Sequence, residues 1–404
     1  MRSANTVLKR WNLETAIVLL VSVALASCSP SLKQQDEAIR QSLASVQATH
    51  APDKRVAVFE IAWSRVGADI VVKGEVGDLS AKDDALAAFS KNAAGQIVDS
   101  VKVLPGQDLG DARFGIVAVS VGNMRGKPQH PAELVTQVLM GTVMKILKKE
   151  GSWYYVQAPD RYLGWLDRDA MALVDQNGVD AWIGASKVIV TDYFGVVRQK
   201  PDGKSYPVSD VVMGGLLGKR SETVRLGGRG GWTEVQLPDG RRGYVEWQIV
   251  QDYATWKRDR KLDGNRVEQV ARLFVGVPYL WGGTSAKGFD CSGFTKIVYR
   301  LNGLDLNRDA DQQAMMGDVV TAGEDFRGLK KGDLLFFGRK ATEERPERIW
   351  HVGIYLGQQE FIHCAGKVRV NSFDPTHPNF DEERLRTYVR SRRLIGISQV
   401  PETL

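Results

Sequence analysis

The apolar positions of this chain repeat with two different periods, and each period predicts its own kind of element. Four apolar residues after position 290 recur at helical spacing: Phe294, Ile297, Val298 and Leu301. They predict an amphipathic helix that begins at about residue 291. Residues 351–356 and 360–363 are instead short apolar runs joined by a Gly-Gln-Gln turn, which predicts an antiparallel hairpin. Residues 55–250 contain mostly similar short runs, so we expect an α+β protein rich in strands.

Two segments between residues 121 and 255 share a pattern that indicates an internal repeat. The matching steps are Gly151-Ser152-Trp153 and Leu163-Gly164-Trp165 in the first segment, and Gly230-Gly231-Trp232 and Arg242-Gly243-Tyr244 in the second. Short strands with such glycine-aromatic steps resemble bacterial SH3-like barrels, whose interiors are filled by alternate inward-facing residues. We therefore expect two small SH3-like β-barrels, over residues 121–180 and 181–255.

The N-terminal 27 residues are typical of an export signal. Basic residues precede an apolar stretch over residues 16–26, which is too short to span a bilayer but suits the core of a signal peptide. Leu25-Ala26-Ser27-Cys28 resembles a bacterial lipoprotein box, which implies that Cys28 becomes the lipidated first residue. We therefore expect a protein of the bacterial cell envelope, anchored through Cys28 to a membrane as a periplasmic or outer-membrane lipoprotein.

Residues 28–54 and 55–120 show no pattern of a catalytic site. The first segment is polar and rich in Gln and Ser, which predicts a tether, with an exposed helix over residues 36–46 as the alternative. The second segment alternates apolar runs with a helix-like stretch over residues 82–90. It predicts a small N-terminal α+β domain of unknown role.

The candidate chemistry lies in Asp290-Cys291-Ser292-Gly293, where the predicted helix begins. A cysteine in the first turn of a helix lies near unpaired N–H groups, which favour its thiolate. Asp290 is expected to be the N-cap, with a direct substrate contact as the alternative. His351 starts one strand of the predicted hairpin and His363 ends the other, so the two become neighbours. A thiol beside an imidazole that a third polar group orients is the arrangement of a cysteine nucleophile.

Other chemistries find little support in the composition. Cys364 follows His363 in a strand and should point to the opposite face, away from Cys291, so we expect a buried thiol rather than a disulfide. The chain has five His and no recognisable Cys/His ligand spacing, so neither a metal nor another cofactor is expected. The net charge of +6 comes without a basic run interleaved with aromatic residues, so we expect no nucleic-acid partner.

Four ordered motifs resemble those of NlpC-type, papain-like cell-wall peptidases. They are Val277-Pro278-Tyr279-Leu280-Trp281-Gly282-Gly283, Phe289-Asp290-Cys291-Ser292-Gly293-Phe294, Leu329-Lys330-Lys331-Gly332-Asp333-Leu334 and His351-Val352-Gly353-Ile354-Tyr355. The resemblance covers residues 262–400 and implies an α+β domain in which a small antiparallel sheet packs on the cysteine helix. It also implies that Cys291 is the nucleophile, His351 the general base and His363 the orienting residue.

Two SH3-like domains before an NlpC-type domain are similar to the γ-D-glutamyl-L-diamino acid endopeptidases of the recycling type. That resemblance implies that the first SH3-like domain walls the cleft and recognises the free amine of an N-terminal L-Ala. The expected substrate-binding residues are Glu133, Tyr162, Tyr279, Trp281, Asp290 and Ser292. Tyr279 is also expected near the oxyanion. Ala310 stands where related sequences often have Ser, which leaves one expected polar contact without its side chain.

These observations predict a lipid-anchored, monomeric cysteine peptidase. Its expected partners are stem peptides of peptidoglycan, which it would cut at the γ-D-Glu to diamino acid bond, and the membrane that holds its anchor. One alternative is a Cys/His peptidase or amidase that acts on intact peptidoglycan. Another is an inactive scaffold in which the SH3-like domains bind the wall.

Overall fold

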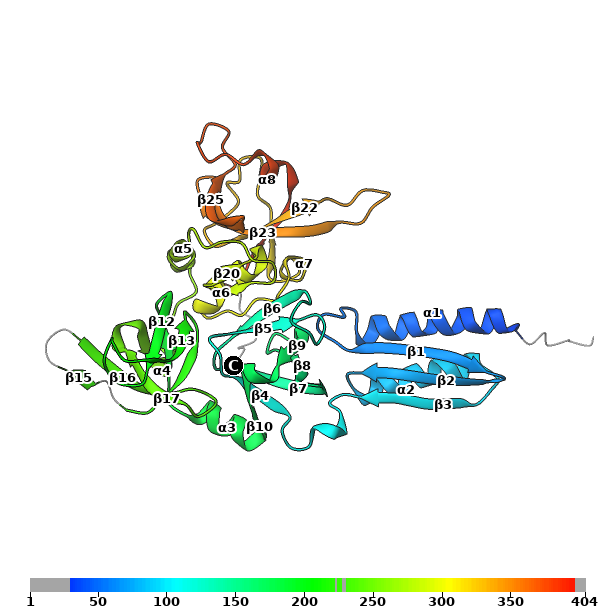
Figure 1. Ribbon diagram of the computed structural model, residues 1–404. Coiled ribbons are helices and arrows are strands. Elements are labelled where there is room, and N and C mark those ends of the chain that lie inside the picture. Colours follow the sequence, from blue (N-terminus) through cyan, green and yellow to red (C-terminus); the bar gives the residue numbers. More distant parts are fainter. Residues whose placement is uncertain (1–29, 222–223, 227–229, 397–404) are drawn as a thin grey trace, which may run out of the picture.

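The computed structural model describes residues 30–221, 224–226 and 230–396, and these residues fold into four domains (Figure 1). The N-terminal domain projects to one side of the first SH3-like domain, and the C-terminal domain covers both SH3-like domains. The predicted signal peptide and the predicted lipidation site Cys28 lie outside the described residues. Within the described residues, no helix has the length and apolar character needed to cross a membrane.

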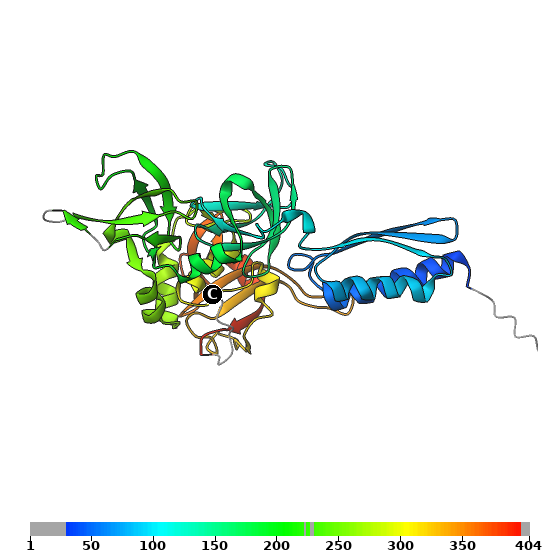
Figure 2. The same ribbon diagram turned by 90° about the horizontal axis from the view of Figure 1, so that it is seen from below.

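The N-terminal domain is a three-stranded sheet with two helices on one face (Figure 2). Its elements are α1 (Leu32–His50), β1 (Phe59–Val66), β2 (Asp69–Val76), α2 (Leu79–Asn92) and β3 (Ile97–Val103). Strand β2 lies in the centre, antiparallel to β1 and parallel to β3. Ile39 of α1 and Phe89 of α2 are fully buried against Ile70 and Val72 of the sheet.

Helix α1 replaces most of the predicted tether. A capping box starts it, in which the Ser31 side chain accepts a bond from the Gln34 amide while the Gln34 side chain accepts one from the Ser31 amide. Ile39, Leu43 and Val46 then repeat at helical spacing and pack into the core of the domain. Of the two predictions for this segment, the helix over residues 36–46 is present within the longer α1, and a flexible tether is not found over residues 32–50. The helix is not exposed as expected, because this apolar stripe packs against the sheet.

The first SH3-like domain is a seven-stranded sheet in the order β10-β4-β7-β8-β9-β5-β6. Its strands are β4 (Phe114–Val117), β5 (Val121–Arg125), β6 (Leu134–Leu139), β7 (Val143–Glu150), β8 (Trp153–Gln157), β9 (Leu163–Asp167) and β10 (Met171–Val174). Strand β4 lies within the range predicted for the preceding domain, but it pairs with β7 and β10. The domain therefore begins before the predicted boundary at residue 121.

The second SH3-like domain repeats this topology. Its strands are β11 (Lys187–Val190), β12 (Phe194–Arg198), β13 (Pro207–Val212), β14 (Leu216–Lys219), β15 (Val224–Leu226), β16 (Gly230–Gln236), β17 (Arg242–Glu246) and β18 (Val250–Asp252). Apart from β15, which pairs with β16 alone, the order β13-β12-β17-β16-β14-β11-β18 matches the first domain strand for strand when read in reverse. The predicted internal repeat is confirmed. Helix α3 (Gln176–Gly184) connects the two copies.

The C-terminal domain packs helix α6 on a six-stranded sheet in the order β21-β26-β22-β23-β24-β25. Its helices are α5 (Gly264–Leu273), α6 (Cys291–Leu301), α7 (Ala310–Gln313) and α8 (Glu382–Thr387), and α4 (Tyr253–Asp259) precedes it. Its strands are β19 (Thr284–Ser285), β20 (Gly288–Phe289), β21 (Asp318–Val320), β22 (Leu334–Arg339), β23 (Arg348–Gly357), β24 (Glu360–Ala365), β25 (Lys367–Ser372) and β26 (Tyr388–Arg393). The predicted helical repeat from Phe294 to Val298 is buried against Val352 and Ile354 of β23, as expected.

Buried hydrogen bonds fix the first SH3-like domain to the loop that precedes the cysteine helix. The Gln137 side chain accepts bonds from the Thr284 amide at 3.0 Å and from the Ser285 hydroxyl at 2.9 Å. Lys296 of α6 pairs with Asp160 at 3.0 Å, and both side chains are nearly buried. Buried polar groups are costly to separate from their hydrogen-bond partners. These contacts therefore hold the first SH3-like domain in a fixed position next to the helix that carries Cys291.

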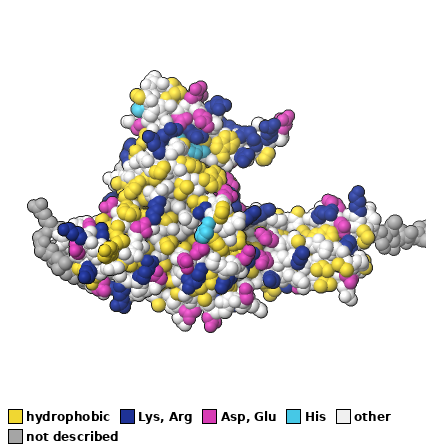
Figure 3. Space-filling model, in the orientation of Figure 1, with side chains coloured by type: hydrophobic (Ala, Val, Ile, Leu, Met, Phe, Trp, Pro, Cys, Tyr) yellow, Lys and Arg dark blue, Asp and Glu magenta, His cyan; other side chains and the backbone are white. Residues whose placement is uncertain are grey.

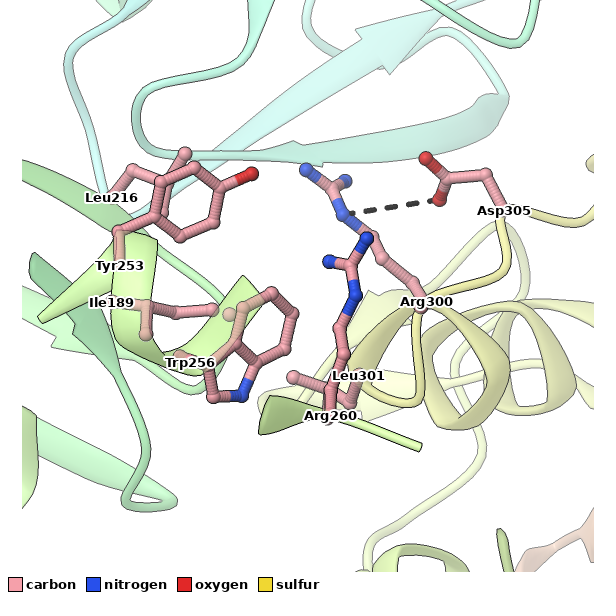
Figure 4. Close-up of a pocket in the computed structure, with 10 residues that line it drawn as sticks. Ile189, Leu216, Tyr253, Trp256, Arg260, Arg300, Leu301 and Asp305 are labelled. Atoms are coloured by element: carbon pink, nitrogen blue, oxygen red, sulfur yellow. Dashed lines mark ion pairs between the residues drawn. The ribbon is translucent and has the colours of Figure 1, made fainter. Parts of the chain in front are cut away.

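The second SH3-like domain meets the C-terminal domain at a different place. Figure 4 shows Trp256 and Arg260, from α4 and the residue after it, facing Arg300 and Asp305 of the C-terminal domain. The cavity between them measures about 40 Å³, and Arg300 pairs with Asp305 at 3.9 Å. A space of this size suits a water molecule rather than a peptide, so this junction is a packing contact.

Candidate active site

Cys291 is the first residue of α6, as the sequence predicts. Asp290 is its N-cap, because the Asp290 side chain accepts a bond from the Gly293 amide at 2.7 Å. The predicted capping role of Asp290 is thereby confirmed. Cys291 is 8% exposed and lines a cleft, so a reacting group can reach the sulfur only from that side.

The charge state of Cys291 differs from the expectation. Burial raises the pKa of Cys291 to about 12, and the negative charge of Asp290 acts in the same direction. The amides of Val352 and Ser292 act against this rise by bonding to the sulfur, but burial outweighs them. Burial thus outweighs the helix start, which was expected to favour the thiolate. The thiol stays protonated at neutral pH, so its attack requires a nearby base.

His351 and His363 lie side by side on the hairpin of β23 and β24, as predicted. Gly353 is opposite His363 in the register, and His351 Nε2 lies 2.8 Å from His363 Nδ1. His363 Nε2 lies 3.0 Å from Asn371 Oδ1. The Asn371 amide nitrogen donates to the Asn379 carbonyl at 3.0 Å, which fixes its oxygen toward His363.

This chain of bonds assigns the tautomers. Because Asn371 Oδ1 can only accept, His363 Nε2 carries the proton and His363 Nδ1 accepts. His351 Nε2 therefore donates, and His351 Nδ1 is left as a free acceptor. Strand β23 passes the nucleophile at this point, since the amide that bonds to the Cys291 sulfur belongs to Val352, the residue after His351.

Both imidazoles are neutral at physiological pH. Burial, followed by the neighbouring His363, lowers the pKa of His351 well below its usual value of 6.5. Burial lowers the pKa of His363 to about 4, although its bond to Asn371 acts in the opposite direction. A neutral His351 with a free Nδ1 is in the state that a general base needs.

A buried ion pair that the sequence reasoning missed supports the start of α6. Arg308 is 1% exposed and donates to Asp290 at 2.5 and 3.2 Å, and to the Ser292 hydroxyl at 3.0 Å. It also reaches across the domain boundary to the Thr136 hydroxyl at 2.8 Å. Asp290 and Ser292 thus hold the helix start as well as lining the cleft. Their predicted contact with substrate stays a prediction.

The cleft at Cys291 has a volume of about 640 Å³ and is walled by three of the four domains. Its lining residues are Arg55, Glu133, Val135, Tyr162, Tyr279, Trp281, Gly282, Asp290, Cys291, Ser292, Arg308, Asp309, Ala310, Asp311, Glu347, Arg348, Ile349 and Trp350. All six predicted substrate-binding residues are among them. The structure therefore brings them together with the predicted nucleophile.

Glu133 and Trp281 face each other across the boundary between the first SH3-like domain and the C-terminal domain. Trp281 Nε1 donates to Glu133 Oε1 at 2.8 Å. Both side chains are exposed, with Trp281 at 64%. A buried carboxylate would attract a cation more strongly, because water would screen its charge less. Because Glu133 is exposed, water weakens its attraction for a cation.

Tyr162 binds a carboxylate that was not among the predicted site residues. Its hydroxyl donates to Asp309 Oδ2 at 2.9 Å, and the Tyr162 side chain is 6% exposed. Burial, then the Asp309 charge, raises the pKa of Tyr162, so it remains a donor. The sequence signal was the pair Arg308-Asp309, which stands directly before the Ala310 already noted.

Tyr279 lies at the cleft wall with 36% of its surface exposed. Burial of the hydroxyl, followed by the charges of Cys291 and Asp290, raises the pKa of Tyr279. The phenol therefore stays protonated and can donate a hydrogen bond. Tyr279 lines the same cleft as Cys291, and its predicted place near the oxyanion stays a prediction.

Cys364 is free, as expected, but its position differs from the prediction. Its Sγ donates to the Phe289 carbonyl at 3.2 Å, and it shares the buried core of α6 with Cys291. The strand alternation does separate it from His363, yet it points toward the helix rather than away from it. Its thiol is buried in apolar surroundings, which suits the predicted inert role.

The sequence predicts that the protein binds no metal and no nucleic acid. No group of three His, Cys, Asp or Glu side chains there is arranged to hold a metal ion. Basic and acidic side chains are interspersed on the face of the molecule in Figure 3. The expected absence of metal and nucleic-acid partners stays a prediction.

Comparisons with known proteins find relatives of the peptidase domain and of the first SH3-like domain. Residues 276–388 match the NlpC/P60 family, and residues 124–171 match the bacterial dipeptidyl-peptidase Sh3 domain. Dipeptidyl-peptidase 6 of Lysinibacillus sphaericus is 32% identical over 278 residues, which cover 67% of this chain and 96% of the relative. A γ-D-glutamyl-L-lysine dipeptidyl-peptidase of Bacillus cereus is 28% identical over 274 residues, which cover 65% and 76%.

A crystal structure of an NlpC/P60 family protein from Bacillus cereus shares the fold. It aligns with a TM-score of 0.57 and 23% identity, over 69% of this chain and 99% of the other. The class of protein is thus defined by a helix that starts at a cysteine and packs on an antiparallel sheet, in a domain that follows SH3-like domains in the sequence. The chain belongs to the NlpC/P60 peptidase family, and the resemblance found in its motifs is confirmed.

Proposed function

We propose that this chain is a cysteine peptidase that hydrolyses the γ-D-Glu to diamino acid bond of peptidoglycan stem peptides. We further propose that it prefers peptides whose N-terminal L-Ala is free. The observation that carries the chemistry is the bond relay from Asn371 through His363 to His351, next to Cys291 at a helix start. The names of relatives such as the γ-D-glutamyl-L-lysine dipeptidyl-peptidases support the bond that is cut.

The relay makes His351 the general base. Its free Nδ1 takes the proton of the Cys291 thiol while the sulfur attacks the γ-carbonyl carbon, because the thiol alone remains protonated at neutral pH. His363 and Asn371 orient the ring and stabilise the imidazolium that forms. The proton then passes from His351 to the leaving amine, which leaves a thioester on Cys291. Water hydrolyses this acyl-enzyme with His351 again as the base.

Developing negative charge on the carbonyl oxygen needs a hydrogen-bond donor. The Tyr279 phenol is suited to this role, because its raised pKa keeps it protonated and it lines the cleft with Cys291. The amide of Cys291 itself, at the free end of α6, is a second suitable donor.

The preference for a free amine follows from carboxylates that line the cleft. Glu133 and Asp309 both do so, and Tyr162 binds Asp309 from the side of the first SH3-like domain. An ammonium group between them would form charge-assisted hydrogen bonds. Asp309 is less exposed to water than Glu133, with 24% of its side chain exposed, so its attraction for an ammonium group is stronger.

A digest of defined peptides tests this proposal. L-Ala-γ-D-Glu-diamino acid peptides should be cut to the dipeptide L-Ala-D-Glu, identified by mass. The same peptides acylated on the Ala nitrogen should be cut more slowly. Equal rates on the matched pair, or release of sugar-linked fragments from intact peptidoglycan, would instead favour an enzyme of the intact wall.

We also propose that the chain is held to a membrane by lipid on Cys28, as the lipoprotein box implies. Helix α1 starts only a few residues after Cys28, so the N-terminal domain would act as a stiff spacer between membrane and cleft. Cys28→Ala should move the protein from the membrane to the soluble fraction without changing its peptidase rate. A mature N-terminus other than Cys28 would contradict lipidation.

A further inference from the structure

The N-terminal domain, whose role the sequence left open, contributes a side chain to the active-site cleft. Arg55 lies in the loop between α1 and β1, and it lines the cleft with Cys291 and Tyr162. It reaches across more than 250 positions of sequence to Asp309 and Asp311, which flank the start of α7.

Carboxylates occupy the whole guanidinium of Arg55. Its Nη1 donates to Asp309 Oδ2 at 2.8 Å and to Asp311 Oδ1 at 2.9 Å. Its Nη2 donates to Asp311 Oδ2 and to Asp53 Oδ2, both at 2.8 Å, and Nε donates to Asp53 Oδ1 at 2.9 Å. A guanidinium has five N–H donors, so none is left for a substrate. Arg55 therefore acts through the carboxylates that it holds.

The loop that carries Arg55 is itself fixed. The Arg55 carbonyl accepts a bond from the Leu163 amide at 2.8 Å, and the Val56 carbonyl accepts one from the Gln157 side chain at 3.0 Å. A buried apolar cluster joins the same two domains and comprises Val58, Leu104, Leu147 and Leu163. Arg55 thus stands on a rigid support formed with the first SH3-like domain, beside Tyr162.

The charges around Arg55 do not balance. Three carboxylates, those of Asp53, Asp309 and Asp311, surround Arg55, and a second cation at this cluster is Arg308, 3.8 Å from Asp309. Burial raises the pKa of Asp309, while the positive charges of Arg308 and Arg55 act to lower it. Asp309 and Asp311 line the cleft, where their carboxylates suit a cationic group, and Arg55 is one of the charges that favour the ionised form of Asp309.

We propose that Arg55 is a positioning residue that fixes the Asp309 and Asp311 carboxylates where the substrate's ammonium group binds. The N-terminal domain is then part of the specificity site. This inference rests on the proposed preference for free-amine stem peptides, and it adds a determinant outside the SH3-like and peptidase domains.

Steady-state kinetics of the full chain on matched free-amine and N-acylated peptides test the inference. Arg55→Ala should raise KM for the free-amine peptide by about tenfold, as loss of a charge-assisted contact implies, and leave kcat within about twofold. The acylated peptide should be cut at the wild-type rate. Arg55→Lys keeps the charge but cannot bridge two carboxylates, so its KM should lie in between.

The pH profile separates positioning from a merely structural role. Without Arg55 the pKa of Asp309 rises further, so the carboxylate protonates at a higher pH. The acid limb of kcat/KM on the free-amine peptide should move up by about one pH unit. Arg65→Ala is the matched control, because Arg65 pairs with Asp36 at 2.8 Å inside the same domain. It should shift neither KM nor the pH profile.

The outcomes distinguish this inference from the function on which it rests. If the wild type cuts both peptides equally, the amine preference and the role of Arg55 both fail. If the wild type prefers the free amine but Arg55→Ala keeps that preference and its pH profile, only the role of Arg55 fails. Should Arg55→Ala not fold, an unchanged KM and pH profile in a folded Arg55→Lys variant would overturn the inference.

Discussion

The two SH3-like domains have the same fold but different surroundings. Arg125 pairs with Leu134 beside a bulge in the first domain, as Arg198 pairs with Pro207 beside a bulge in the second. Each arginine binds the carbonyl two residues before the next strand, that of Ala132 at 3.1 Å in the first domain and that of Ser205 at 2.7 Å in the second. The backbone of this turn is therefore equivalent in the two copies.

The side chains at equivalent positions of the two copies differ and make different contacts. Glu133 of the first domain meets Trp281 in the cleft, whereas Tyr206 at the equivalent position of the second is 79% exposed. Tyr162 binds Asp309, whereas its equivalent Arg241 binds Asp239 and the Ala118 carbonyl. The comparison teaches that two copies of one fold can carry different side chains at equivalent positions. Under the proposed function, Glu133 and Tyr162 of the first copy contribute to specificity, because they line the cleft.

The proposed chemistry lies in the peptidase domain alone, and Cys291→Ser is its strongest test. A hydroxyl is far less ready than a thiol to lose its proton to His351, so kcat should fall by at least about a thousandfold. Binding of the free-amine peptide should persist. Cys364→Ser is the control and should stay active, since a hydroxyl can also donate to the Phe289 carbonyl. Loss of activity in both variants would indicate that each substitution disturbs the buried core that Cys291 and Cys364 share, rather than the chemical step.

The relay behind His351 should give the next largest effect. His363→Ala removes the acceptor that orients His351 Nε2, and kcat should fall by roughly a hundredfold. Asn371→Ala leaves His363 without its fixed acceptor, and a fall of roughly tenfold is expected, in line with other outer-shell partners. If either variant raised KM but left kcat unchanged, the result would contradict the relay. It would indicate that the residue acts in substrate binding instead.

The same relay predicts the pH dependence. The proposed mechanism requires neutral His351, and burial of the ring lowers the pKa of His351 well below 6.5. Protonation therefore begins only below that value, so kcat/KM on an N-acylated peptide should stay level from neutral pH down to about pH 6.5. A decline that starts above pH 7 would mean that the resting base is not this buried imidazole.

The sequence predicted where the candidate site residues lie better than it predicted the domain borders, for physical reasons. The helix start at Cys291 and the hairpin of His351 and His363 were predicted correctly, because both are local features with clear periodicity. Their catalytic roles stay a prediction. Asn371 and Arg308 were missed, since their role depends on strand pairing and on an ion pair across the fold. Strand β4 was assigned to the wrong domain because its partner β7 lies some thirty positions later.

Glu133 and Tyr162 should affect selectivity rather than the chemical step. Glu133→Gln removes an exposed charge, so the preference for the free-amine over the acylated peptide should fall by at most about tenfold. Tyr162→Phe removes the bond to Asp309 and should reduce the preference by a similar or smaller factor. Equal losses on both peptides would show instead that these side chains only hold the domains together.

The smallest effect is expected from Tyr206→Ala, which changes the position in the second SH3-like domain that is equivalent to Glu133. Tyr206 does not line the cleft and most of its surface is exposed, so stability and the preference for the free amine should stay within about twofold of the wild type. Kinetics on the matched peptides, run beside Glu133→Gln, would check this directly. If Tyr206→Ala slowed the release of fragments from insoluble peptidoglycan while soluble peptides were cut normally, the second copy would be a binding surface for polymer. The contrast would then be between two recognition domains with different ligands, rather than between one that recognises substrate and one that only supports the fold.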